Sequence, residues 1–310
     1  MKIIFMGTPD FAVPCLDMLV KEGHEVCLVV TQPDKPKGRG KKMLFPPVKE
    51  KAIEYGIEVF QPVKVKEEEA VEKLRSYNAD IIVVVAFGQI LPESILNMPK
   101  YGCINVHGSL LPKYRGAAPI QWSVINGDTK TGVTTMYMEK GLDTGDMLLK
   151  AEFDITSEDT YGTVHDKMCV MGADVLKETL VKIENGTIVR EKQDDALSNY
   201  APMISKETGH IDWNKTSFEI INLIRGLDPV PAAWTVYNDE VLKIWKAVKF
   251  ECDNSTAKCG EIADITKKGF VVKTGDGFVL VTEIQARGGK RMATDAYMRG
   301  HAVEKGIVLE

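Results

Sequence analysis

Residues 102–119 read GCINVHGSLLPKYRGAAP. The apolar residues at its start are typical of a buried strand, and side chains two apart on a strand point to the same face. Asn105 and His107 are therefore expected side by side. The glycine, serine and proline that follow end the strand and place this polar pair at its carboxyl end, where open α/β sheets bind ligands.

Asn105 and His107 are chemically suited to an acyl-transfer site. An asparagine amide and a protonated imidazole can both donate a hydrogen bond to an oxygen that gains negative charge. An alternative stays open, in which Asn105 caps a turn and His107 is a histidine satisfied within the core. A third polar group nearby would favour the catalytic interpretation.

Residues 138–146, MEKGLDTGD, supply such a group. This glycine-flanked turn follows the apolar strand predicted over residues 132–138. Asp143 is the candidate, because a nearby carboxylate favours the imidazolium form of a histidine and can help to move a proton. The alternative is that Asp143 and Asp146 serve ordinary turn chemistry.

Length and composition indicate a globular protein with two domains. The chain has 310 residues, of which 44% are apolar and 27% are charged, and its formal charge is −5. No membrane span or signal peptide is expected, so we expect a cytoplasmic protein. The six cysteines show no C-x-x-C spacing, which favours reduced thiols and predicts no metal site.

Strands and helices alternate in the first part of the chain. This alternation predicts an α/β fold with a doubly wound, largely parallel Rossmann-like sheet. The predicted strands cover residues 2–6, 26–30, 57–60, 81–85, 103–106, 132–138 and 147–153, and the predicted helices cover residues 13–21, 48–55, 67–77 and 160–184. The turn GTPD at residues 7–10 has a single glycine, which argues against NAD binding.

The loop at residues 31–47 is long and basic. It carries five lysines and arginines between glycines and prolines, with Asp34 as its one acid. Such a segment can pair with phosphates and become ordered on binding, which would let an acidic protein hold nucleic acid. The alternative is a solvated surface loop.

The chain is predicted to divide into residues 1–185, a linker at residues 186–206 and a second domain at residues 207–310. Five short predicted strands in the second domain indicate a small barrel. They cover residues 233–237, 241–248, 260–265, 269–274 and 278–285. Acidic and basic residues nearly balance there, so any contact with RNA must be a local patch. The candidates are Lys243, Lys246, Lys249, Arg287, Lys290 and Arg291.

Three segments resemble the folate-dependent formyltransferases: MGTPDF at residues 6–11, NVHGSLLP at residues 105–112 and GLDTG at residues 141–145. The resemblance implies that Asn105, His107 and Asp143 are catalytic and that the second domain is an OB-like β-barrel. It also implies a folate-contacting loop made of Ser109, Leu110, Leu111 and Pro112.

The basic loop resembles an insertion in those members of the family that act on initiator methionyl-tRNA. The resemblance implies that Arg39, supported by Lys41 and Lys42, contacts the tRNA. The implied reaction moves the formyl group of 10-formyltetrahydrofolate, the donor substrate, to the methionine amino group, with no metal and with the protein as a monomer. The alternatives are a formyltransferase for nucleotide-linked amino sugars, a hydrolase of the same folate, and an inactive protein that binds tRNA or folate.

Overall fold

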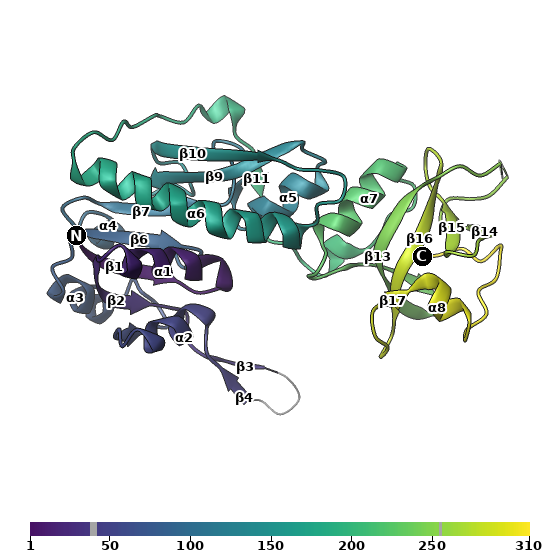
Figure 1. The fold of residues 1–310 in the computed structure, drawn as a ribbon, viewed down its shortest axis with the longest axis horizontal. Helices are drawn as coiled ribbons and strands as arrows, with labels where there is room; N and C mark the ends of the chain where they lie inside the picture. Colours follow the sequence, from purple (N-terminus) through teal and green to yellow (C-terminus); the bar gives the residue numbers. More distant parts are fainter. Residues whose placement is uncertain (38–41, 254–255) are drawn as a thin grey trace. The chain divides into compact units, whose positions relative to one another are not determined.

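A computed structural model describes residues 1–37, 42–253 and 256–310 of the chain (Figure 1). These residues fold into two units. The first contains Met1–Pro119, Lys130–Phe153 and His165–Ala201, and the second contains Ile120–Thr129, Asp154–Val164 and Pro202–Glu310. The domain boundaries at residues 185 and 207 stay a prediction.

The first unit is built on a seven-stranded sheet. In spatial order its strands are β10 (Met147–Asp154), β9 (Lys130–Tyr137), β7 (Cys103–His107), β6 (Ile81–Val85), β1 (Lys2–Gly7), β2 (Glu25–Val30) and β5 (Val59–Phe60). The five strands from β7 to β5 are parallel, and β9 is antiparallel to β7. This arrangement confirms the predicted largely parallel, Rossmann-like sheet.

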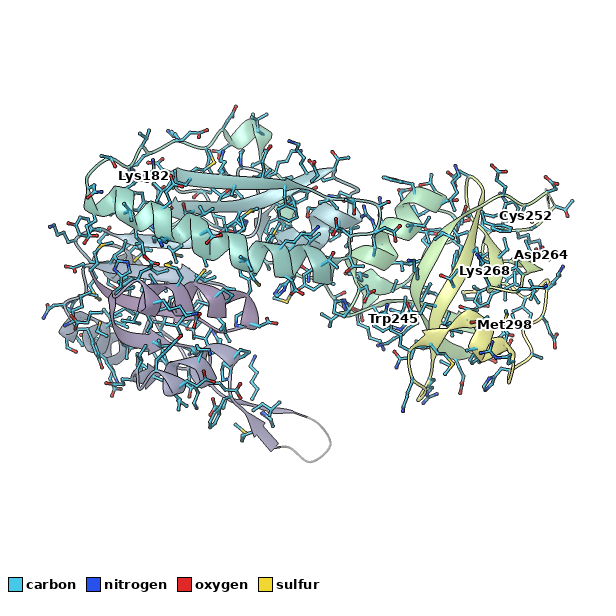
Figure 2. All side chains as sticks on the ribbon, in the orientation of Figure 1. Lys182, Trp245, Cys252, Asp264, Lys268 and Met298 are labelled. Atoms are coloured by element: carbon cyan, nitrogen blue, oxygen red, sulfur yellow. The ribbon has the colours of Figure 1, made fainter. Side chains whose placement is uncertain are left out.

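Helices cover both faces of this sheet. The main ones are α1 (Val13–Lys21), α2 (Pro47–Glu54), α3 (Glu68–Ser76), α4 (Glu93–Leu96) and α6 (Tyr161–Glu184). The side chains of α3 and α4 share one apolar cluster with alternate residues of β1, β2 and β6. Helix α6 lies along α1 (Figure 1) and is joined to β9 by a 2.8 Å hydrogen bond between the hydroxyls of Thr135 and Thr179. Lys182 marks its last turns (Figure 2).

Two small sheets and a short helix add to these elements. Strands β3 (Lys35–Lys37) and β4 (Lys42–Leu44) form an antiparallel hairpin within the basic segment, for which the sequence predicts a loop without strands. Strand β8 (Arg115–Gly116) pairs in parallel with β11 (Tyr200–Ala201). Helix α5 (Pro119–Ile125), which apart from Pro119 belongs to the second unit, is also not predicted by the sequence.

The second unit contains an antiparallel sheet. Its strands are β12 (Ala233–Tyr237), β13 (Glu240–Phe250), β16 (Phe278–Ala286), β15 (Phe270–Lys273) and β14 (Ile262–Ile265) in spatial order, with β17 (Met292–Ala293) on β16. All five predicted strands are present. Trp245 lies on β13 (Figure 2). Helix α7 (Ser217–Gly226) begins with a capping box of Thr216 and Glu219. Its apolar side chains and those of the sheet form the core of this unit. Helix α8 (Thr294–Met298) follows β17.

No helix within the described ranges is both long enough and apolar enough to cross a membrane.

The packing of the first sheet predicts a large penalty for a cavity at Leu28. This β2 side chain is completely buried between β1 and the α3 face. Leu28→Ala should lower the free energy of unfolding by about 2–5 kcal/mol, because a buried leucine leaves a cavity that the sheet cannot close. Urea unfolding followed by circular dichroism measures this change. The matched control is Leu197→Ala, at a side chain that is 64% exposed, which should change stability by less than about 0.5 kcal/mol. Equal effects of the two substitutions would contradict the predicted packing.

Candidate active site

Strand β7 places Asn105 and His107 on one face at its carboxyl end, as the sequence predicts. Asn105 pairs with Val84 of β6 and Met136 of β9, and His107 pairs with Thr134 of β9. The two side chains are 9% and 6% exposed. The register thus holds an amide and an imidazole just beneath the surface, at the edge where the parallel strands end.

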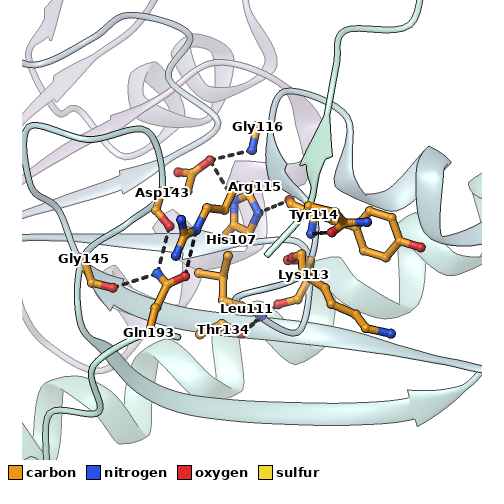
Figure 3. A network of polar contacts seen from close by, with 12 residues as sticks. His107, Leu111, Lys113, Tyr114, Arg115, Gly116, Thr134, Asp143, Gly145 and Gln193 are labelled. Atoms are coloured by element: carbon orange, nitrogen blue, oxygen red, sulfur yellow. Dashed lines mark hydrogen bonds and ion pairs between the residues drawn. The ribbon is translucent and has the colours of Figure 1, made fainter. Parts of the chain in front are cut away.

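Both ring nitrogens of His107 face protein groups (Figure 3). Nε2 lies 2.9 Å from the main-chain oxygen of Tyr114, and Nδ1 lies 3.8 Å from Oδ2 of Asp143. A carbonyl oxygen only accepts hydrogen bonds, so Nε2 carries a hydrogen. In the neutral ring, Nδ1 therefore carries no hydrogen, and its lone pair faces the Asp143 carboxylate.

Asp143 is held in place by the backbone of another loop. Its Oδ2 accepts a 2.9 Å hydrogen bond from the main-chain N–H of Gly116 (Figure 3). Asp143 has a left-handed backbone with φ of 52°, as has Tyr114 with φ of 61°. This conformation costs a residue with a side chain about 1–2 kcal/mol, so contacts around the two loops must stabilise it.

The Asn105 amide differs from these two groups because no described residue forms a hydrogen bond with it. The residue is 9% exposed, and its amide atoms keep some contact with solvent. Its remaining exposure leaves it within reach of a bound molecule. The structure therefore brings Asn105, His107 and Asp143 together, with one hydrogen-bond donor left free.

The residues that hold this arrangement were missed by sequence reasoning. Gln193, 7% exposed, donates 2.8 Å hydrogen bonds to the main-chain oxygens of Asp143 and Gly145 and accepts one of 3.0 Å from Nε of Arg115 (Figure 3). Asn199 accepts a hydrogen bond from the main-chain N–H of Tyr114. Both lie in the segment predicted as a linker, and no local pattern distinguishes them from other polar loop residues.

The predicted folate-contacting loop is partly internal. Ser109 is fully buried, with its hydroxyl bonded to the main-chain oxygen of Lys113, and Leu111 packs against Met136 and Met147. Leu110 and Pro112 remain partly exposed. Only the last two therefore have side-chain surface available to a ligand in this structure.

Only one of the predicted tRNA contacts lies within the described residues. Arg39 and Lys41 are outside the described residues, and Lys42 begins β4. At the base of the hairpin Lys49 contacts both carboxylate oxygens of Asp34, the shorter distance being 2.6 Å, and Gln61 bonds the same carboxylate. Lys49 is therefore neutralised by a protein partner.

The basic candidates of the second unit are also partly paired. Arg291 bonds Asp228 and Glu283, at 2.8 and 2.7 Å, and its guanidinium lies over the ring of Trp245. These carboxylates raise the pKa of Arg291 above its ordinary value, chiefly through the hydrogen bonds with Glu283. Lys246 lies 3.4 Å from Glu158. Arg291 thus links β16, through Glu283, to the loop before β12, through Asp228.

A cysteine nucleophile is not supported on β7. Burial raises the pKa of the Cys103 thiol to about 12, so it stays protonated at neutral pH. The thiol instead lies near the carbonyl oxygens of Ile95 and Leu96. Within the described part of the chain, no group of three or more histidine, cysteine or acidic side chains is arranged to hold a metal ion.

Comparison with known proteins agrees with these observations. The family model described as Formyl transferase matches residues 1–180, and the one described as Formyl transferase, C-terminal domain, matches residues 203–302. Among solved structures, an N-formyltransferase from Helicobacter canadensis, in complex with folinic acid and dTDP-3-aminofucose, has a TM-score of 0.66 at 22% identity, covering 94% of this chain and 100% of its own. HypX from Aquifex aeolicus, in complex with tetrahydrofolic acid, has a TM-score of 0.65 at 16% identity over 99% of this chain and 50% of its own.

Two relatives are much closer in sequence. The methionyl-tRNA formyltransferase of Clostridioides difficile is 55% identical over 309 residues, which cover 100% of both chains. That of Ruminiclostridium cellulolyticum is 54% identical over 307 residues, which cover 99% of this chain and 98% of the relative. The chain belongs to the methionyl-tRNA formyltransferase family.

Proposed function

We propose that this protein transfers the formyl group of 10-formyltetrahydrofolate to the amino group of methionine on initiator methionyl-tRNA. The observation that carries this proposal is the free, buried amide of Asn105 beside the His107–Asp143 pair. The family of the chain supplies the substrates, because its relatives at about half identity are methionyl-tRNA formyltransferases over the full length.

In the first step the methionine amine attacks the formyl carbon. A carbon–nitrogen bond forms, and the carbonyl electron pair moves onto the formyl oxygen. Asn105 donates a hydrogen bond to this oxyanion, and because the amide has no described protein partner, the bond costs no other interaction. The sequence pattern predicts a share in this role for His107, but Nε2 of His107 donates its hydrogen to the main-chain oxygen of Tyr114 in the structure.

We assign His107 and Asp143 to proton transfer instead. Nδ1 of His107 and the Asp143 carboxylate are both acceptors, 3.8 Å apart, so a proton given up by the amine can be taken up by this pair. The tetrahedral intermediate then collapses. Its bond to N10 of the folate breaks, N10 takes a proton, and formyl-methionyl-tRNA and tetrahydrofolate are released.

The folate and the tRNA are assigned to separate segments. Leu110 and Pro112 are proposed to contact the folate through their exposed side chains, and Ser109 and Leu111 are proposed to shape the loop from beneath. Arg39, Lys41 and Lys42 are proposed to contact tRNA phosphates. All three catalytic residues come from one chain, so we propose a monomer, acting in the cytoplasm where aminoacyl-tRNA is used.

A three-substrate assay tests the proposed function. The purified protein with 10-formyltetrahydrofolate is given charged initiator methionyl-tRNA, a nucleotide-linked amino sugar or water alone, and the products are identified by mass spectrometry. We expect rapid formyl-methionyl-tRNA and little formyl-sugar or free formate. Formyl-sugar or formate as the main product would refute the proposed acceptor, and no product with any of the three would indicate a binding protein without activity.

Asn105→Ala should separate activity from stability. Loss of one oxyanion donor is expected to lower kcat by about 10²–10³-fold. Because the amide has no described partner, its removal leaves no protein group unpaired, and the unfolding temperature should stay the same or rise. Steady-state kinetics and thermal unfolding measure the two effects. Asn185→Ala, at an exposed residue, is the control and should change neither. Near-normal turnover in Asn105→Ala would exclude Asn105 as a donor.

Asp143→Asn should test the proton-transfer pair. The amide oxygen can still accept from the Gly116 N–H, but the charge that faces His107 is lost, so kcat should fall by about 10²–10⁴-fold. Asp146→Asn provides a control in the same loop, since Asp146 pairs with Arg190, and it should keep kcat within about threefold. Equal losses in the two variants would mean that the loop tolerates no substitution, which would argue against a specific role for Asp143.

A further inference from the structure

The segment after α6 is attached at several points to β10 and to the loops of the active site. We call residues 187–201 the strap. Near its start, Glu191 and Met147 exchange main-chain hydrogen bonds of 2.8 and 2.9 Å, which attach the strap to β10. At its end, β11 pairs with β8. Between these attachments the strap passes both loops that contact His107, and all of these residues belong to the first unit.

Gln193 is the strap residue with the most connections to the site. Its amide nitrogen donates to the main-chain oxygens of Asp143 and Gly145, and its amide oxygen accepts from Arg115 (Figure 3). All of its hydrogen-bonding groups thus have partners, and the side chain is buried. One side chain therefore joins the loop that carries Asp143 to the loop that carries Arg115 and Gly116.

Asp143 is consequently fixed at two points. Gln193 holds its main-chain oxygen, and the Gly116 N–H holds its carboxylate. Gly116 is itself pressed against the strap: its φ is 118°, and a side chain there would come within 2.6 Å of Tyr200 and 2.7 Å of the Ala201 oxygen. Both attachments of Asp143 therefore depend on the strap.

We propose that Gln193 is a positioning residue for the transfer reaction, which keeps the Asp143 carboxylate facing Nδ1 of His107. This inference rests on the proposed function. Without the Gln193 donor, the main-chain oxygens of Asp143 and Gly145 lose this partner, and the side-chain link from the Asp143 loop to Arg115 is broken. A shift of the carboxylate by about 1 Å can cost a reaction about 100-fold, whereas substrate binding is unaffected.

Gln193→Glu is the sharpest test variant. It keeps the length of the side chain and an acceptor for Arg115, but it loses the N–H donors and points a second acceptor at the two carbonyl oxygens. We expect kcat for formyl transfer to fall by about 10–100-fold, with KM for the folate and the tRNA within about twofold. Gln193→Met removes the same donors without adding charge and serves as a second variant if the glutamate variant does not fold.

Asp195→Asn is the matched control. Asp195 is two residues along the strap and also bonds Arg115, at 2.7 Å, but its side chain is 83% exposed and does not touch the Asp143 loop. Its kcat should stay within about twofold of the wild type, because exposed ion pairs contribute little. A loss equal to that of Gln193→Glu would show that the effect comes from Arg115 and would overturn the proposal.

A double variant distinguishes positioning from a general structural role. If Gln193 acts through Asp143, Gln193→Glu should lower kcat by less than about threefold in the Asp143→Asn background, because residues that act as a unit are not additive. Multiplied losses would overturn the proposal, as would a kcat for Gln193→Glu equal to that of the wild type.

The imidazole NMR signals of His107 give a readout that does not need activity. Gln193→Glu should shift them in the same direction as Asp143→Asn does, because both weaken the contact of the carboxylate with Nδ1. Unchanged signals would overturn the proposal. A wild-type protein that forms no formyl-methionyl-tRNA would refute the proposed function instead, and the NMR comparison would still decide the role of Gln193.

Discussion

The arrangement of the site depends on the hydrogen bond between Nε2 of His107 and the carbonyl oxygen of Tyr114. Because this oxygen can only accept, it determines which ring nitrogen carries the hydrogen, and so it leaves the Nδ1 lone pair facing Asp143. The backbone of Tyr114 must be left-handed to present its oxygen there, and Asn199 stabilises it by accepting from its N–H. The orientation of the His107 ring, the group that it presents to Asp143 and the backbone conformation of Tyr114 therefore depend on one another.

The buried amide of Asn105 indicates why these supports are needed. An amide donor next to an acceptor pair stays available only if the backbone holds these groups apart, so that they do not bond to one another. Pairing of β7 with β6 and β9 on both sides fixes the Asn105 backbone. The left-handed Asp143 loop adds a local cost, which its hydrogen bonds offset. The Asn105 amide can thus stay free only because the strands and loops around it are held in place.

The sequence predicted those features that depend on local patterns. Apolar runs and period-2 alternation located every strand of the large sheet and brought Asn105 and His107 to one face, and glycine-flanked polar residues located Asp143. The hairpin at β3 and β4 was missed because its lysines and prolines do not resemble a strand. Gln193 was missed for another reason: its role depends on contacts about 50 and 80 residues away in the chain, and a single glutamine in a polar segment carries no sign of them.

The site alone does not decide which amine is formylated. The N-formyltransferase from Helicobacter canadensis, solved with dTDP-3-aminofucose, has the same fold, and a fold does not by itself specify which molecule is bound. Selectivity for the tRNA must therefore come from groups outside the Asn105–His107–Asp143 cluster, and these groups must be free to bind phosphates. Arg291 and Lys49 are less suited to this, because each already bonds a carboxylate of the protein, and losing that bond would offset part of the gain from a phosphate. Recognition of the tRNA therefore requires other lysines and arginines, and the glycine-spaced basic run from residue 35 to residue 42 remains our prediction for them.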